Sequence, residues 1–80
     1  MLIQTEVGRA EVVAKQLADL PGVRSAEYVT GPYDVVARVG AETLDELHRD
    51  VVTAVQRAAG ITRTLTCPIA NSPIAGARHP

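Results

Sequence analysis

The residues best suited to hold a small polar ligand lie at the tip of a predicted hairpin, which reads Thr30, Gly31, Pro32, Tyr33 and Asp34. Gly31 lets backbone amides approach a carboxylate closely, and the Asp34 carboxylate can accept a hydrogen bond from an α-ammonium group. Tyr33 is one of only two aromatic side chains, and a place at a loop tip favours a contact role. The alternative is a plain turn, in which Gly31-Pro32 serves geometry and Asp34 bonds nearby backbone amides.

A second set of polar groups lies on the last predicted strand, where Thr62, Thr64 and Thr66 alternate with other residues. Alternation places the three hydroxyls on one face of the strand, where they are available to a polar ligand. Threonine is also a favoured strand residue, and for any one of the three this plain structural reading is the stronger. We include Thr64 and Thr66 among the predicted ligand-binding residues.

The sequence contains no motif of an enzyme or a metal site. His48 has no second histidine, cysteine or carboxylate at metal-ligand spacing, and His79 falls in a predicted loose tail. Cys67 precedes Pro68 and is expected to be a small buried apolar residue rather than a nucleophile. The chain has no nucleophile elbow, no phosphate-binding glycine loop and no paired carboxylates with a histidine. We predict no metal, no cofactor and no enzymatic activity.

The composition restricts the class of protein. Eighty residues allow one small domain, with a core of aliphatic side chains because Phe and Trp are absent. Eight basic and nine acidic residues are interleaved, with a net charge of −1, which argues against nucleic-acid binding. The start of the chain lacks the features of a secretory signal, and no apolar run is long enough to span a membrane. These patterns predict a cytoplasmic protein that binds neither DNA nor membranes directly.

The first half of the chain predicts a strand, a helix and a hairpin. Residues 1–7 alternate with period two, and residues 9–20 carry apolar side chains on one helical face before Pro21-Gly22 ends the helix. Residues 23–30 and 35–39 have strand composition, with the turn residues between them.

The second half repeats this order. Thr43 to Glu46 forms a capping box, in which Glu46 is expected to accept a hydrogen bond from the amide of Thr43 itself. The apolar face of the helix that follows is predicted from Leu44, Leu47, Val51, Ala54, Val55 and Ala58. Residues 61–69 then alternate as a strand that ends near Pro68. We predict a ligand-binding domain at 1–70 and a flexible C-terminal tail at 71–80.

The order βαββαβ predicts an α+β domain with the ferredoxin-like fold, a four-stranded antiparallel sheet with two helices on one face. The other face should be polar in a monomer. The pattern does not predict a polar face, because both faces of these strands are apolar. The third strand has Val35 on one face and Val36 on the other, and the first strand has Leu2 on one face and Ile3 and Val7 on the other. We therefore expect the open sheet face to pack on an identical face of another chain, as in a dimeric α/β barrel.

Three segments together resemble a known family: Leu20-Pro21-Gly22-Val23, the run Thr30 to Val35, and Thr62-Arg63-Thr64. This combination, within residues 1–70, is similar to the effector-binding or RAM domain of the Lrp/AsnC transcription regulators. The resemblance implies dimers joined through their sheets, rings such as octamers, and an amino acid or related metabolite bound between subunits. It also implies ligand contacts from residues 30–34 and from the last strand of a neighbouring subunit.

Full-length members of that family carry a helix-turn-helix domain ahead of this region, whereas Met1 here stands at the first strand. We therefore expect a stand-alone sensing module that modulates transcription through mixed oligomers with full-length regulators. Two other hypotheses remain open. One is a small dimeric ferredoxin-like oxygenase or isomerase that uses His48 or Asp34. The other is an adaptor that binds family members and no small molecule.

Overall fold

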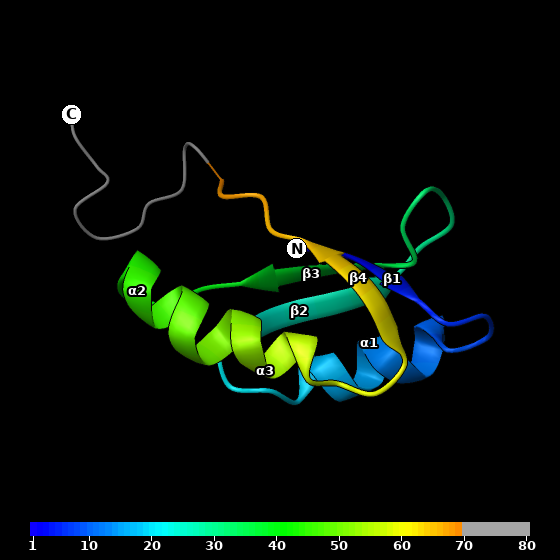
Figure 1. The fold of residues 1–80 in the computed structure, drawn as a ribbon, viewed down its shortest axis with the longest axis horizontal. Helices are drawn as coiled ribbons and strands as arrows, with labels where there is room; N and C mark the ends of the chain where they lie inside the picture. Colours follow the sequence, from blue (N-terminus) through cyan, green and yellow to red (C-terminus); the bar gives the residue numbers. More distant parts are fainter. Residues whose placement is uncertain (70–80) are drawn as a thin grey trace.

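The structure is a computed structural model that describes residues 1–69 of the chain, so the tail predicted at 71–80 lies outside the described residues. Strands and helices alternate in the predicted order βαββαβ (Figure 1). Between the third and fourth strands, α2, η1 and α3 form one continuous helix. The elements are β1 (Leu2–Thr5), α1 (Ala10–Ala18), β2 (Val23–Tyr28), β3 (Val35–Val39), α2 (Leu44–Glu46), η1 (Leu47–Val52), α3 (Thr53–Gln56) and β4 (Ile61–Leu65).

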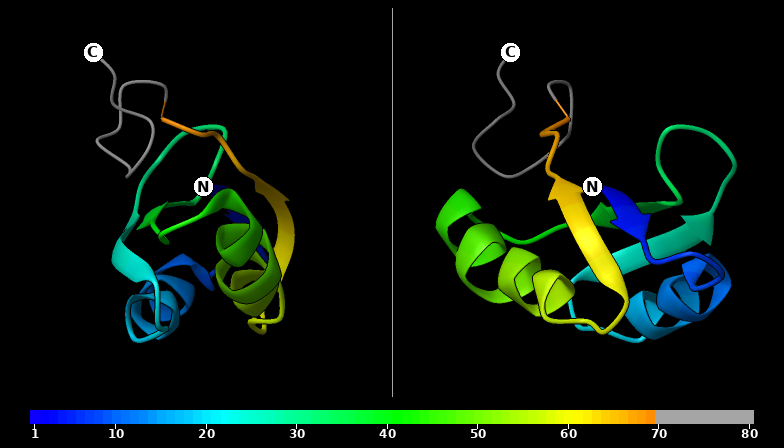
Figure 2. Two further views of the ribbon diagram at one scale, coloured as in Figure 1. Left: turned by 90° about the vertical axis from the view of Figure 1, so that its left-hand side faces the viewer. Right: turned by 45° about the vertical axis from the view of Figure 1, so that its right-hand side comes forward.

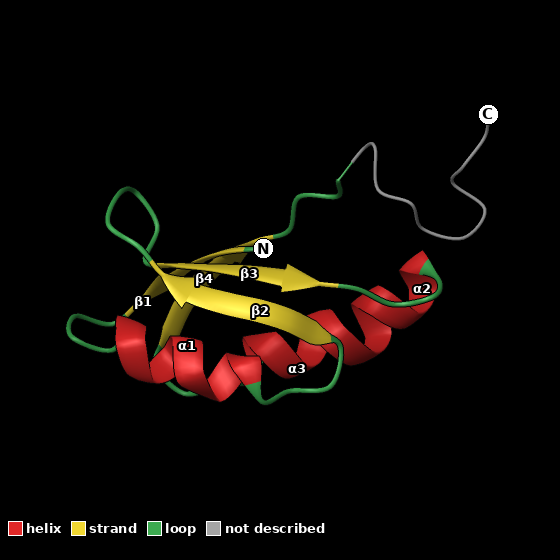
Figure 3. Ribbon diagram, turned by 180° about the vertical axis from the view of Figure 1, so that it is seen from behind, coloured by secondary structure: helices red, strands yellow, loops and turns green. Residues whose placement is uncertain are grey.

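The four strands form one antiparallel sheet in the order β2-β3-β1-β4. Figures 2 and 3 show both helices on the same side of this sheet, which leaves the other face open. The two strands that begin the βαβ units, β1 and β3, are central, and β2 and β4 form the edges. This arrangement confirms the predicted ferredoxin-like fold.

The core lies between the sheet and the helices. The strands contribute Ile3, Val35 and Ala37, whose exposed fractions are 0–1%. The helices contribute Val13, Ala14, Leu17, Val52 and Val55. Fully burying one aliphatic side chain of this size contributes about 1.5–3 kcal/mol to folding, and these side chains supply nearly all of the core because no Phe or Trp is present.

The second helix begins with the predicted cap at Thr43. The Glu46 backbone amide donates to the Thr43 hydroxyl oxygen at 3.0 Å. The prediction for the Glu46 side chain is wrong in its partner, because its carboxylate accepts from the backbone amide of Glu42 at 3.0 Å rather than from Thr43. The carboxylate therefore satisfies an amide one residue ahead of the cap.

The middle of that helix is a π-helix, which changes the predicted apolar face. The Thr53 hydroxyl donates to the carbonyl oxygen of His48, five residues earlier, at 3.0 Å. The wider turn brings both Val51 and Val52 into buried positions, and Val52 was not predicted. Leu44, predicted to face the core, is 60% exposed.

Three strands are shorter than predicted. β1 ends at Thr5, and Val7 is fully exposed, so its predicted place in the strand, on the same face as Ile3, is wrong. The chain turns there, since Gly8 has a φ of +80°. β2 ends at Tyr28, two residues before the predicted end. β4 ends at Leu65, the residue that pairs with Leu2 at the start of β1, and so it stops before Pro68.

Candidate functional site

Asp34 ties the predicted ligand loop to the first strand. Its carboxylate Oδ2 accepts from the backbone amide of Thr5, and its own amide donates to the Ile3 carbonyl oxygen, both at 2.8 Å. Its carbonyl oxygen accepts from the Val29 amide at 2.8 Å, which closes the loop. On the other side of β1, the register with β4 shifts between Gln4 and Thr5. One carboxylate oxygen of Asp34 is therefore already in use for structure.

The rest of the loop is accessible. Thr30, Gly31 and Pro32 are exposed, and Tyr33 is partly buried. The side-chain amide of Gln4, in β1, donates to the Pro32 carbonyl oxygen at 3.0 Å and provides a second link between the loop and this strand. Gly31 has a φ of +151°, and a Cβ added there would have no atom within 4 Å. The loop thus has a fixed base and an open tip.

The two predicted threonines of the last strand have different surroundings. The Gln56 side-chain amide donates to the Thr64 hydroxyl oxygen at 3.1 Å, and Thr64 pairs with the core residue Ile3, so it faces the helices. Thr66 follows the end of β4 and lines a pocket with segments far away in the sequence. The structure does not place the two hydroxyls in one site.

The loop and Thr66 also lie at opposite ends of the sheet. The loop precedes β3 and is tied to the end of β1, whereas Thr66 follows Leu65, which pairs with Leu2 at the start of β1. Figure 1 shows the loop at the right, and the arrowhead of β4 away from it, beside the N-terminus. One subunit therefore does not bring the predicted ligand-binding residues together.

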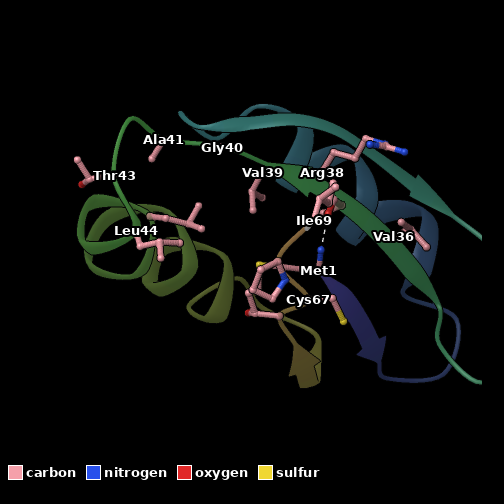
Figure 4. A pocket seen from close by; sticks show the side chains of 14 residues that line it. Met1, Val36, Arg38, Val39, Gly40, Ala41, Thr43, Leu44, Cys67 and Ile69 are labelled. Carbon is pink, nitrogen blue, oxygen red and sulfur yellow. Dashed lines mark hydrogen bonds between the residues drawn. The ribbon is translucent and has the colours of Figure 1, made fainter. Parts of the chain in front are cut away.

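A pocket of about 230 Å³ opens at the end of the sheet where Thr66 lies (Figure 4). Its walls come from the end of β3, the start of the second helix and the segment after β4. The sequence reasoning did not predict it, because its apolar members are spread over the whole chain. One of them is Leu44, the first residue after the Thr43 cap, which is exposed to solvent rather than buried in the core. The lining residues are Met1, Val36, Ala37, Arg38, Val39, Gly40, Ala41, Thr43, Leu44, Leu47, Thr66, Cys67, Pro68 and Ile69.

The pocket is mainly apolar, with a few polar groups. The α-amino group of Met1 donates to the Ala37 carbonyl oxygen at 2.6 Å, marked by the dashed line in Figure 4. Burial lowers the pKa of this amino group from its ordinary value of 8.0; nearby Cys67 opposes this shift, and nearby Arg38 adds to it. Cys67 is exposed, which corrects the expectation that it is buried.

The described residues show no assembled catalytic or metal site. His48 is exposed on the second helix, and its side chain makes no hydrogen bond within residues 1–69. No group of three potential metal ligands occurs in that part of the chain. None of its helices is long and apolar enough to cross a membrane.

The sequence pattern of the Lrp/AsnC ligand-binding domain matches residues 1–78, so the chain belongs to this family. Members of this family are regulatory ligand-binding domains of transcription regulators, as the resemblance of the three sequence segments predicted.

Similar proteins include the uncharacterized HTH-type transcriptional regulators PH1916 of Pyrococcus horikoshii, 33% identical over 54 residues, and PF0250 of Pyrococcus furiosus, 32% identical. The match covers 68% of this chain and 36% of each regulator, so it spans about a third of their length.

Solved structures of other proteins have a similar fold. Hypothetical protein PHS023 from Pyrococcus horikoshii is 27% identical with a TM-score of 0.70, covering 78% of this chain and 75% of that one. TTHA0845 from Thermus thermophilus is 30% identical with a TM-score of 0.69, covering 85% and 92%.

Proposed function

We propose that this chain is an effector-sensing module that binds an amino acid or related small metabolite at contacts between subunits. Membership of a ligand-binding regulatory family supports the general role. The observation that carries the proposal is the separation of the predicted contacts, since residues 30–34 and Thr66 lie at opposite ends of one sheet. A site that uses both must take them from different subunits.

Association through the open sheet face is part of this proposal. Leu2 pairs with Val36 on one side and Leu65 on the other, so the three form an apolar row across the sheet. Leu65 is 46% exposed, although it is a large apolar residue of this row. A second copy would remove that surface from water.

The proposed ligand would meet polar groups that the fold leaves accessible. Thr30 and Gly31 are exposed residues, and one carboxylate oxygen of Asp34 makes no hydrogen bond within residues 1–69. These groups suit the carboxylate and the ammonium of an amino acid. Binding would change transcription only by shifting assembly, including mixed oligomers with full-length regulators in the cytoplasm.

Native mass spectrometry of the protein, alone and with a mixture of common amino acids, tests the proposal. We expect an even-numbered assembly that gains the mass of one amino acid or changes size with it. Thr66→Val, which keeps the side-chain volume, should weaken that binding about fivefold through loss of one hydrogen bond. Thr62→Val is the matched control. The Thr62 hydroxyl donates to the Gln4 carbonyl oxygen at 3.2 Å and is not a predicted ligand contact, so the same substitution there should leave ligand binding unchanged.

Two results would contradict the proposal in different ways. An assembly that binds none of the amino acids would favour the adaptor hypothesis. Turnover of a substrate that is lost in His48→Ala would favour the enzyme hypothesis.

A further inference from the structure

The open face of the sheet carries charges at its two edges. Residues paired directly across antiparallel strands share a face, and Ile3 is fully buried against the helices, so Leu2 and Gln4 lie on the open face. Arg63 on edge strand β4 pairs with Gln4, and Glu27 on edge strand β2 pairs with Val36, which itself pairs with Leu2. Glu27 and Arg63 therefore lie on the same face, at opposite edges.

Neither edge charge has an ion-pair partner among the described residues of its own subunit. Among residues 1–69, the ion pairs join Lys15 to Glu11, and Arg49 to Asp45 and Asp50. Both Glu27 and Arg63 are exposed. Between them lies the apolar row of Leu2, Val36 and Leu65, so the acidic and basic edges flank an apolar centre. The face also carries the exposed Arg38, on central strand β3 and two residues beyond Val36.

This pattern is complementary to itself in one orientation. A two-fold axis parallel to the strands, passing between β3 and β1, places β2 of one copy over β4 of the other. Val36 then faces Leu2 of the second copy. Glu27 then faces Leu65 of the second copy. Arg63 of that copy is two residues from Leu65, about 7 Å along the strand, a distance that the long side chains of Glu27 and Arg63 can bridge.

The other in-plane orientation is electrostatically unfavourable. With an axis across the strands and through the apolar row, each strand faces its own copy, so Glu27 meets Glu27. Like charges placed together at an interface disfavour that arrangement. The charges thus select one of two alignments that the apolar row alone would allow.

We propose that Glu27 of one copy and Arg63 of another form an ion pair, twice per dimer, and that these pairs align the two sheets with the two-fold axis parallel to the strands. This inference rests on the association through the open face proposed above. It assigns a role to two exposed residues that the ligand site does not use.

Charge reversal in separate and mixed variants tests the proposal. Glu27→Lys or Arg63→Glu alone replaces two attractions per dimer with two repulsions, so sedimentation should show a dissociation constant raised about tenfold or more. An equimolar mixture of the two single variants should form a one-to-one heterodimer of near wild-type affinity, because both of its contacts join opposite charges. The double variant should likewise recover affinity as a homodimer.

Arg38→Glu is the matched control, since Arg38 is exposed, pairs with Ser25, and lies on the opposite side of the apolar row from Arg63. It changes the net charge as Arg63→Glu does but should show no preference for heterodimers with Glu27→Lys over homodimers. The preference for heterodimers should weaken in about 1 M salt, where charges are screened beyond roughly 3 Å.

The outcomes separate this inference from the proposed function. A dimeric wild type whose single variants mix without preference, or an Arg38→Glu that matches Arg63→Glu, would overturn the ion pair alone. A wild type that stays monomeric at high concentration would overturn the association through the open face and the ion pair with it.

Discussion

The two faces of the sheet are built from alternating residues of the same strands, yet they differ in how completely they are covered. On the helix face, Ile3, Val35 and Ala37 are at most 1% exposed. On the open face, Leu65 remains 46% exposed, and Leu2 and Val36 are only partly buried. The helix face therefore holds the subunit together, whereas the open face has apolar surface available for a second subunit.

The largest effect is expected from Ile3→Ala on the helix face. The fully buried side chain leaves a cavity between the sheet and both helices, and the free energy of unfolding should fall by about 3 kcal/mol. Urea denaturation followed by circular dichroism measures this change. Val12→Ala, at a position that is 41% exposed, is the control. A loss below about 1 kcal/mol for Ile3→Ala would mean that this face is not the main core.

Gly22→Ala tests how closely the second helix packs over the same face. Gly22 has a φ of +86°, and an added Cβ would lie 2.5 Å from Cγ2 of Val51 in the π-helix. Strain and overlap together should lower the free energy of unfolding by about 2 kcal/mol. Gly8→Ala is the control, because its φ is +80° but no atom lies within 4 Å of the added Cβ. Equal losses in both variants would show that Val51 moves without resistance.

Asp34→Ala tests the end of the sheet, where the loop is tied to β1. Loss of the charge-assisted hydrogen bond from the Thr5 amide should lower the free energy of unfolding by about 1.5 kcal/mol. Hydrogen exchange at the Thr5 amide should become faster. Asp34→Asn keeps an acceptor oxygen and should lose less. If exchange at Thr5 stays unchanged in Asp34→Ala, the carboxylate does not hold the loop.

Leu65→Ser on the open face should have the smallest effect on the isolated subunit. The side chain is already largely accessible, so the free energy of unfolding at high dilution should change by about 0.5 kcal/mol or less. If the face is covered by a second copy, the loss grows as protein concentration rises. If the loss of unfolding free energy does not depend on protein concentration, the open face is not covered by a second copy.

The order of elements could be predicted because each one has its own local signal. Period-two alternation, the helical stripe of α1 and the Thr43 cap all depend on residues close together in the chain. The π-helix could not be predicted, since the burial of both Val51 and Val52 depends on segments far away in the chain, such as the turn at Gly22 against Val51. The early end of β1 was missed for a similar reason, because the Thr5 amide donates to a carboxylate 29 residues away.

The candidate site was predicted in its residue types but not in its arrangement. Asp34 was expected either to receive a ligand or to bond a backbone amide, and the structure shows the second for one of its oxygens. Thr64 and Thr66 alternate on the same strand, yet Thr64 bonds Gln56 under the helix, and Thr66 lines a pocket beyond the end of the strand. Alternation predicts a shared face but not what covers each position along it.

The sequence by itself determined the strands, the helices, the family and the residues that alternate between the two faces. These features depend on local periodicity, turn residues and short motifs. Tertiary structure alone decided that residues 30–34 and Thr66 lie at opposite ends of the sheet, and that Glu27 and Arg63 lie at opposite edges of one face. The physical reason is that strand order and register are set by hydrogen bonds between segments far apart in the chain.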